Sequence, residues 1–256
     1  MTESTFTDYI GPEGLRTRGT VLVLPGRGES SLTYQRFARR LAADSYHLRV
    51  LAEPALDDAD LTGTLEGVAT QLTDAVADIE LDRPLVLVGS DTGAAALAAL
   101  VSRSGSSDAV WWPQALVLAA LPGYGAQATG DWDEELNART SCSVHRGVLS
   151  DDPTIARGAL SAVVSPALLD AAYGSTVDVP QLLLVGDADP FADREALARA
   201  LKTLPTARLA VVRGAHHDVL NDLQHRSVAA EIITFLEQLR NEPSLEPIIV
   251  ADSSAW

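Results

Sequence analysis

A glycine-flanked turn carries Asp91, whose carboxylate could take part in a chemical reaction. Residues 85–97 run from apolar to small and polar to alanine-rich, which predicts a strand, a tight turn and a helix. Gly89 and Gly93 stand two residues before and two after Asp91, which puts Asp91 at the apex of the turn. A carboxylate with an ordinary pKa of about 4 is ionised at pH 7. It can therefore act as a nucleophile without a base to activate it.

Two later turns carry acids and histidines. Asp187 and Asp189 follow the apolar run 181–185, and His216 follows the run 207–212, with His217 directly after it. Acids and prolines are also common in ordinary turns at strand ends. The order along the chain is nevertheless apex residue, acid, histidine, which is the order of a hydrolytic triad.

Together these motifs resemble the α/β-hydrolase superfamily. Its nucleophile elbow has the pattern G-x-S-x-G at a strained strand-to-helix turn. Here Asp91 stands where the pattern has serine. An aspartate at this place resembles the haloalkane dehalogenase and epoxide hydrolase branches. The resemblance covers residues 19–240 apart from 124–178.

The resemblance selects one acid and one histidine. The usual acid form is glycine, two residues, aspartate and often proline, which matches Asp189 better than Asp187. Residues 213–222 are similar to the histidine segment of lysophospholipase-like and monoacylglycerol-lipase-like members. When the two segments are aligned, His217 takes the place of the catalytic histidine, and His216 is the close alternative. The resemblance implies that His217 activates water and that the acid orients its ring.

Donors for developing negative charge are expected after the first buried strand. Family members often carry His-Gly there, whereas this chain has Pro25-Gly26. Gly26 would let the Arg27 N–H point into the site, with the Thr92 N–H as its partner. The Arg27 side chain could bind an anionic substrate, face solvent or pair with an acid such as Glu29.

Two other interpretations of the elbow stay open. Asp91 could simply cap the helix that follows, because aspartate is a preferred N-cap residue and tolerates left-handed backbone. Ser90 could instead be the nucleophile. Its flanking residues would then be Val88 and Thr92, whose β-branched side chains a tight elbow excludes.

Apolar runs and helical patterns alternate around these residues. The expected strands are 19–24, 46–51, 85–88, 115–120, 181–185 and 207–212, and the expected helices are 32–44, 63–80, 92–103, 192–203 and 224–240. Such alternation predicts an α/β fold with a mostly parallel, doubly wound sheet. Residues 1–18 are expected to form an irregular first strand or a loose arm.

The alternation breaks in residues 124–178, which have no clean strand and a helical stretch at 153–173. We interpret this segment as a short lid on an α/β-hydrolase core made of residues 1–123 and 179–240. Four residues are expected to line the substrate pocket: Gly26, Ser90, Trp132 and His145. Residues 241–256 form a tail that ends in Trp256, expected to extend over the surface or to dock on a neighbour, which would allow a homodimer.

Composition narrows the class further. A chain of 256 residues fits one domain with a sizeable core. One cysteine rules out an internal disulfide, and with no secretory signal pattern we expect a cytoplasmic protein. A net charge of −16 disfavours nucleic acid and anionic membranes as partners, and no apolar run is long enough for membrane insertion. No metal or cofactor is expected, because Cys142 and His145 lack a second pair of ligands.

These observations predict a cofactor-free hydrolase with an Asp91–His217–Asp189 triad acting on a small molecule. Attack by a carboxylate on an ester carbonyl gives an uphill anhydride, whereas attack on a saturated carbon gives an ordinary ester. An epoxide or C–halogen substrate is therefore expected, although Thr92 stands where those branches carry Trp or Arg. One alternative is an esterase or lysophospholipase-like hydrolase using Ser90, or Asp91 as a base. The other is a non-hydrolytic ligand-binding protein, lyase or cyclase.

Overall fold

The computed structural model describes residues 6–105, 108–125, 129–241 and 245–250. The strands are β1 (Phe6–Tyr9), β2 (Thr20–Leu24), β3 (His47–Leu51), β4 (Leu85–Ser90), β5 (Ala115–Ala119), β6 (Gln181–Gly186) and β7 (Ala207–Val212). The helices are α1 (Gln35–Ala43), α2 (Leu61–Val76), α3 (Asp91–Ser104), α4 (Trp132–Arg139), α5 (Ser143–Asp151), α6 (Pro166–Tyr173), α7 (Arg194–Thr203) and α8 (His225–Asn241), with 3₁₀ helices η1 (Ser31–Tyr34) and η2 (Ala159–Ser161). Every expected core strand and helix is present, and the ends of most of them are shifted by a few residues.

The strands form one sheet in the order β1-β3-β2-β4-β5-β6-β7. All neighbouring strands are parallel except β1, which runs antiparallel to β3. The expected mostly parallel sheet is therefore confirmed. Of the two possibilities for the N-terminal segment, residues 6–9 take the strand, and Arg49 on β3 holds it by donating to both carboxylate oxygens of Asp8.

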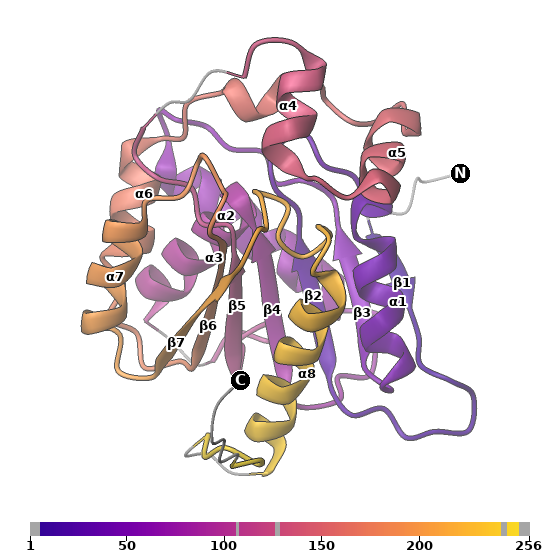
Figure 1. Cartoon of the computed structure of the whole chain (residues 1–256). Helices are drawn as coiled ribbons and strands as arrows, with labels where there is room; N and C mark the ends of the chain where they lie inside the picture. The colour runs from indigo at the N-terminus through magenta and orange to yellow at the C-terminus, as the bar shows by residue number, and fades with distance from the viewer. Residues whose placement is uncertain (1–5, 106–107, 126–128, 242–244, 251–256) are drawn as a thin grey trace.

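Both faces of the sheet are buried, which explains why its strands read as continuous apolar runs. Along β2, Val21 and Val23 belong to a core cluster with α1 and α8. Leu22 and Leu24 point the other way, into a cluster with α2, α3, α6 and α7. Figure 1 shows α1 and α8 in front of the sheet and α2 and α3 behind it.

The segment interpreted as a lid contains more helix than the sequence indicated. Only η2 and α6 fall in the expected stretch 153–173, whereas α4 and α5 precede it. The apolar periodicity of α4 is weak because two of its buried positions are Glu135 and Arg139, which pair at 3.0 Å. The Asp131 side chain caps α4 by accepting from the Glu134 N–H at 3.0 Å.

Helix α4 packs on the loop after β7, at the carboxyl end of the sheet. The backbone N–H groups of His217 and Asp218 donate to carbonyls at the end of α4, at 3.1 and 2.8 Å. Helix α6, in contrast, contributes Leu168 and Leu169 to the main core cluster beside α3. The limits of the lid at 124 and 178 stay a prediction.

The tail is only partly described. Ile249 and Val250 are largely exposed, and Trp256 lies outside the described residues. Of the helices that the structure describes, none combines the length and the apolar character needed to cross a bilayer. The homodimer stays a prediction.

Candidate active site

The turn between β4 and α3 holds Asp91 in a conformation that side chains rarely adopt. Its φ is +49°, in the left-handed region. A Cβ on Gly89 would lie 2.5 Å from the Ala94 Cα, and one on Gly93 would lie 2.3 Å from the Pro25 carbonyl oxygen. The flanking glycines are therefore required by close backbone contacts, as the elbow pattern predicts.

The Asp91 carboxylate is 2% exposed and is bound on two sides by Arg27. The Arg27 Nε and Nη2 donate to its two oxygens at 2.7 and 2.8 Å, a bidentate ion pair. The Arg27 backbone N–H donates to the same carboxylate at 3.0 Å. These bonds come from the loop after β2, and the residue in the N-cap position of α3 is Ser90. The Asp91 carboxylate therefore does not serve as the N-cap of α3.

His217 lies on the other side of the carboxylate. Its Nε2 is 3.3 Å from Asp91 Oδ1, an ion-pair contact without an aligned hydrogen bond. Its Nδ1 is 3.1 Å from both oxygens of Asp189. Asp189 is fixed in turn by the Phe191 N–H at 2.9 Å, and the Phe191 ring meets the histidine ring edge-on. The structure thus brings Asp91, His217 and Asp189 into one chain of contacts.

The alternative acid and histidine lie elsewhere. His216 binds Asp222 through its backbone N–H at 2.7 Å and through Nδ1 at 3.0 Å. Asp187 accepts from the Gly214 N–H at 2.6 Å and so closes the turn after β7. Both residues stabilise loops beside the site instead of facing Asp91.

Opposite charges in the site fix the resting protonation states. Burial raises the pKa of Asp91, but the Arg27 guanidinium and His217 outweigh it and hold that pKa well below its ordinary value. Burial lowers the pKa of His217, but Asp189 and Asp91 outweigh it and raise the pKa to about 10. At neutral pH the site therefore contains a carboxylate beside an imidazolium.

The predicted donor and pocket residues around the elbow lie close to Asp91, and they differ in what they contact in the structure. The Arg27 N–H donates to Asp91 itself in this state. Ser90 is buried and lies near Tyr34. Thr92 is buried with its hydroxyl unpartnered. Gly26 leaves no room for a side chain, because a Cβ there would lie 2.6 Å from the Asp91 Cβ.

The two lid residues expected in the pocket lie outside the cavity at Arg27. Trp132 packs beside the lid cluster of Leu136, Leu149 and Ile155 and below the guanidinium of Arg157. His145 is buried, with its Nε2 2.8 Å from an oxygen of Asp218. In the structure Trp132 contacts neighbouring apolar residues and His145 contacts Asp218, and their expected contact with substrate stays a prediction.

The cavity at Arg27 is small, about 10 Å³. It is lined by Arg27, Phe191, Tyr124 and the segment 160–164 of the lid. The Arg27 Nη1 donates to the Leu160 carbonyl at 3.1 Å and also to the Ala162 carbonyl. One side chain therefore ties the lid segment to the elbow and closes the site.

A buried charge cluster supports the loop that carries Arg27, and sequence reasoning missed it. Glu29 accepts from the Gly26 N–H at 2.7 Å, and Arg139 donates to the Arg27 carbonyl at 2.8 Å. Asp218 lies 3.5 Å from Arg139. Burial and the charge of Asp218 raise the pKa of Glu29 to about 7. The only signal in the sequence was the Glu-x-x-x-Arg spacing on α4, which is common on exposed helices.

The arrangement contains no ready metal centre. Within the described ranges, no group of three or more histidine, cysteine or acidic side chains is placed to hold a metal ion.

Comparison with known proteins supports the fold. No family model matches the chain, and no curated protein matches its sequence. Among solved structures, Paleococcus ferrophilus monoacylglycerol lipase is similar over 94% of this chain and 98% of its own, at 15% identity and a TM-score of 0.69. A soluble variant of Saccharomyces cerevisiae monoglyceride lipase, solved with a substrate analogue, matches over 91% of both chains at 13% identity and a TM-score of 0.68.

A lipase-esterase related protein from Clostridium acetobutylicum is similar over 91% of this chain and 100% of its own, at 15% identity and a TM-score of 0.68. The α/β-hydrolase fold predicted from the elbow and the strand–helix alternation is thereby confirmed. Identities this low establish the fold alone.

Proposed function

We propose that this protein is an ester hydrolase in which Asp91 acts as a general base and His217 as a general acid. One observation carries the proposal: an ionised carboxylate at the elbow apex lies 3.3 Å from a histidine that a second carboxylate, Asp189, keeps protonated. These are the protonation states that a base and an acid need before the reaction begins.

The reaction follows from those states. Water attacks the ester carbonyl carbon while Asp91 removes one of its protons, and backbone N–H groups of the Arg27 loop and the start of α3 stabilise the oxyanion. The intermediate then collapses, the bond from carbon to the alcohol oxygen breaks, and His217 donates a proton to the departing oxygen. Transfer of the proton from Asp91 to His217 restores the starting state.

Arg27 determines when Asp91 can work. While the guanidinium binds the carboxylate at 2.7 and 2.8 Å, Asp91 is too weakly basic to accept a proton from water. An anionic group on the substrate would compete for Arg27, release the carboxylate and raise its pKa. We therefore propose esters that carry a second, anionic group as the preferred substrates.

Two lines of support favour ester chemistry over the expected epoxide or C–halogen chemistry. Monoacylglycerol lipase and monoglyceride lipase are among the proteins of the same fold. The histidine segment is also similar to that of the lipid-ester branch.

The test compares p-nitrophenyl esters of butyric acid and of the monoanion of succinic acid. We expect turnover of the succinate ester to exceed that of the butyrate ester, and Asp91→Asn or His217→Gln to reduce it about 10²–10⁴-fold. Ser90→Ala is the matched control and should change turnover less than threefold. Loss of activity in Ser90→Ala with activity retained in Asp91→Asn would overturn the proposal.

A second candidate is attack of Asp91 on a saturated carbon, which is favoured by the apex position of the carboxylate at φ +49°. Attack would form an ester on Asp91 and expel halide or open an epoxide. A single turnover in ¹⁸O-labelled water distinguishes general-base catalysis from direct attack by Asp91. General-base catalysis labels the product in the first turnover, whereas the nucleophilic route delivers an unlabelled oxygen from Asp91.

A further inference from the structure

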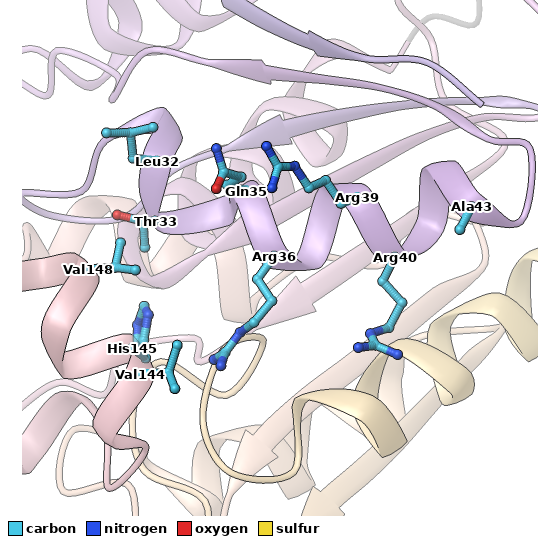
Figure 2. A pocket seen from close by; sticks show the side chains of 10 residues that line it. All are labelled: Leu32, Thr33, Gln35, Arg36, Arg39, Arg40, Ala43, Val144, His145 and Val148. Atoms are coloured by element: carbon cyan, nitrogen blue, oxygen red, sulfur yellow. The ribbon is translucent and has the colours of Figure 1, made fainter. Parts of the chain in front are cut away.

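A second and larger cavity lies on the outside of the molecule, between α1 and α5. It measures about 530 Å³, within the range of small-molecule sites. Figure 2 shows arginine side chains along α1 and the side chains of Val144, His145 and Val148 facing them from α5. We call this cavity the arginine groove and define it by Arg36, Arg39, Arg40, Leu32, Val144 and Val148.

Three arginines border the groove, and none of them has a carboxylate partner among the described residues. No ion pair between Arg36, Arg39 or Arg40 and an acid is found in the part of the chain that the structure describes. The partners of Arg36 are neutral, the Asn221 carbonyl and the Cys142 thiol. The Nε of Arg40 is buried and has no hydrogen-bond partner among the residues that the structure describes. Unpaired cations are unexpected in a chain with 35 acidic and 19 basic residues.

The positive charge of the groove also affects His225, which lies nearby. Burial lowers the pKa of His225, and the charges of Arg36, Arg40 and Arg226 lower it further. Geometry places the arginines on two sides of the outer face of α1, because Arg36 and Arg40 are four residues apart and Arg39 is offset from both. In Figure 2 the side chains of Arg36 and Arg40 point the same way, and Arg39 lies on the other side with Gln35.

The other end of the groove is apolar. Val144 is 62% exposed and Leu32 is 47% exposed, which leaves two apolar side chains open to solvent beside the cations. Val148 completes this end from the next turn of α5. A ligand that fits both ends needs one anionic group and a short apolar chain.

We propose that the arginine groove binds a small anionic amphiphile, such as a medium-chain carboxylate or alkyl phosphate. The anionic group lies among the arginines and accepts hydrogen bonds from their guanidinium N–H groups, while the apolar chain covers Leu32, Val144 and Val148. Guanidinium groups suit this role because their N–H donors match carboxylate and phosphate oxygens. The groove does not include Asp91, Asp189 or His217, so the site is separate from the proposed hydrolytic one.

An anionic membrane surface is a poorer match than a single molecule. The net charge of −16 repels such a surface as a whole, whereas a monomeric ligand enters the local field of the groove. The cavity also has a volume suited to one small ligand.

Calorimetric titration of the full chain tests the proposal with octanoate, octyl phosphate, octanol and inorganic phosphate. We expect one molecule of octanoate or octyl phosphate to bind, at least tenfold more tightly than octanol or inorganic phosphate. That result would mean that binding requires both the negative charge and the apolar chain of the ligand. The affinity should fall with added salt.

Variants locate the binding. Arg36→Gln with Arg40→Gln should weaken octanoate binding tenfold or more, and so should Val144→Asp, which repels the ligand from an exposed position. The matched control is Arg194→Gln with Arg199→Gln, two exposed arginines on α7, which should leave the affinity within twofold. Asp91→Asn should also leave it unchanged, which separates the groove from the proposed hydrolytic site.

Three results would overturn the proposal. One is no binding of octanoate or octyl phosphate at millimolar concentration. Another is binding that neither Val144→Asp nor the arginine variants weaken. The third is partition onto phosphatidylglycerol vesicles without binding of the monomeric ligands, which would make the groove a membrane contact. If the double arginine variant fails to fold, Val144→Asp and Arg39→Gln carry the test.

Discussion

Arginines have opposite surroundings in the two cavities. Arg27, 8% exposed, gives two side-chain hydrogen bonds to Asp91 and closes a cavity of about 10 Å³. In the arginine groove, three arginines border about 530 Å³ without a carboxylate partner among the described residues. The first region is closed and electrically balanced, and the second is open and unbalanced.

The difference follows from burial. A charge removed from water must be paired, because an unpaired buried ion costs several kcal/mol. A charge at an open groove keeps its hydration, so nothing inside the protein has to neutralise it. In the function that we propose, a competing anion has to release Asp91 from Arg27 before the closed region can react, whereas the groove arginines need no such release before they bind the proposed anion.

The largest effect is expected from breaking the pair in the closed region. Asp91→Asn leaves the Arg27 guanidinium buried without a carboxylate, which should lower the free energy of unfolding by about 3–5 kcal/mol. Urea unfolding at pH 7 measures it. Adding Arg27→Met to Asp91→Asn should recover part of the loss, because the unpaired charge is then gone. No recovery in the double variant would contradict the account of the pair.

The next effect concerns the buried cluster beside Arg27. The pKa of Glu29 is raised to about 7, so its contribution to stability is complete below the unfolded value of 4.5 and is lost as the pH rises through about 7. Glu29→Gln stays neutral at all pH values. At pH 8 the variant should be more stable than the wild type by up to about 3 kcal/mol, and at pH 4 the two should be alike. Unfolding curves at both pH values check this, and equal stability at pH 8 would count against it.

A smaller effect is expected at His217. Its pKa is raised to about 10, so its stabilising contribution is complete below pH 6.5 and is lost as the pH rises through about 10. Asp91→Asn removes one of the two raising charges, and the pKa should fall by at least about one unit, about 1.4 kcal/mol. Ring resonances followed by NMR over pH 6–11 measure the shift. An unchanged pKa would mean that Asp91 does not act on His217.

The smallest effect is expected in the groove. Arg39→Gln removes a cation that has no acid partner within the described parts of the chain, so the free energy of unfolding should change by no more than about 0.5 kcal/mol. The same urea titration provides the measurement. A loss as large as that of Asp91→Asn would show that the groove arginines are structural, and the contrast between the regions would disappear.

The sequence by itself determined the alternation of strands and helices and the elbow. These are local properties, because a buried parallel strand needs a continuous apolar run and the turn needs glycines on both sides of Asp91. The order of Asp91, Asp189 and His217 along the chain followed from the same sequence pattern, since each lies in the turn or loop that follows a strand.

Only the tertiary structure decided what these residues contact. The Arg27 side chain binds Asp91 and not Glu29, and Trp132 and His145 hold lid helices. The Arg27–Asp91 and His145–Asp218 contacts join segments 64 and 73 residues apart in the chain, so no local pattern specifies them. The arginine groove also depends on tertiary structure, because Arg36 and Val144 line one cavity only after α5 packs on η1, which directly precedes α1.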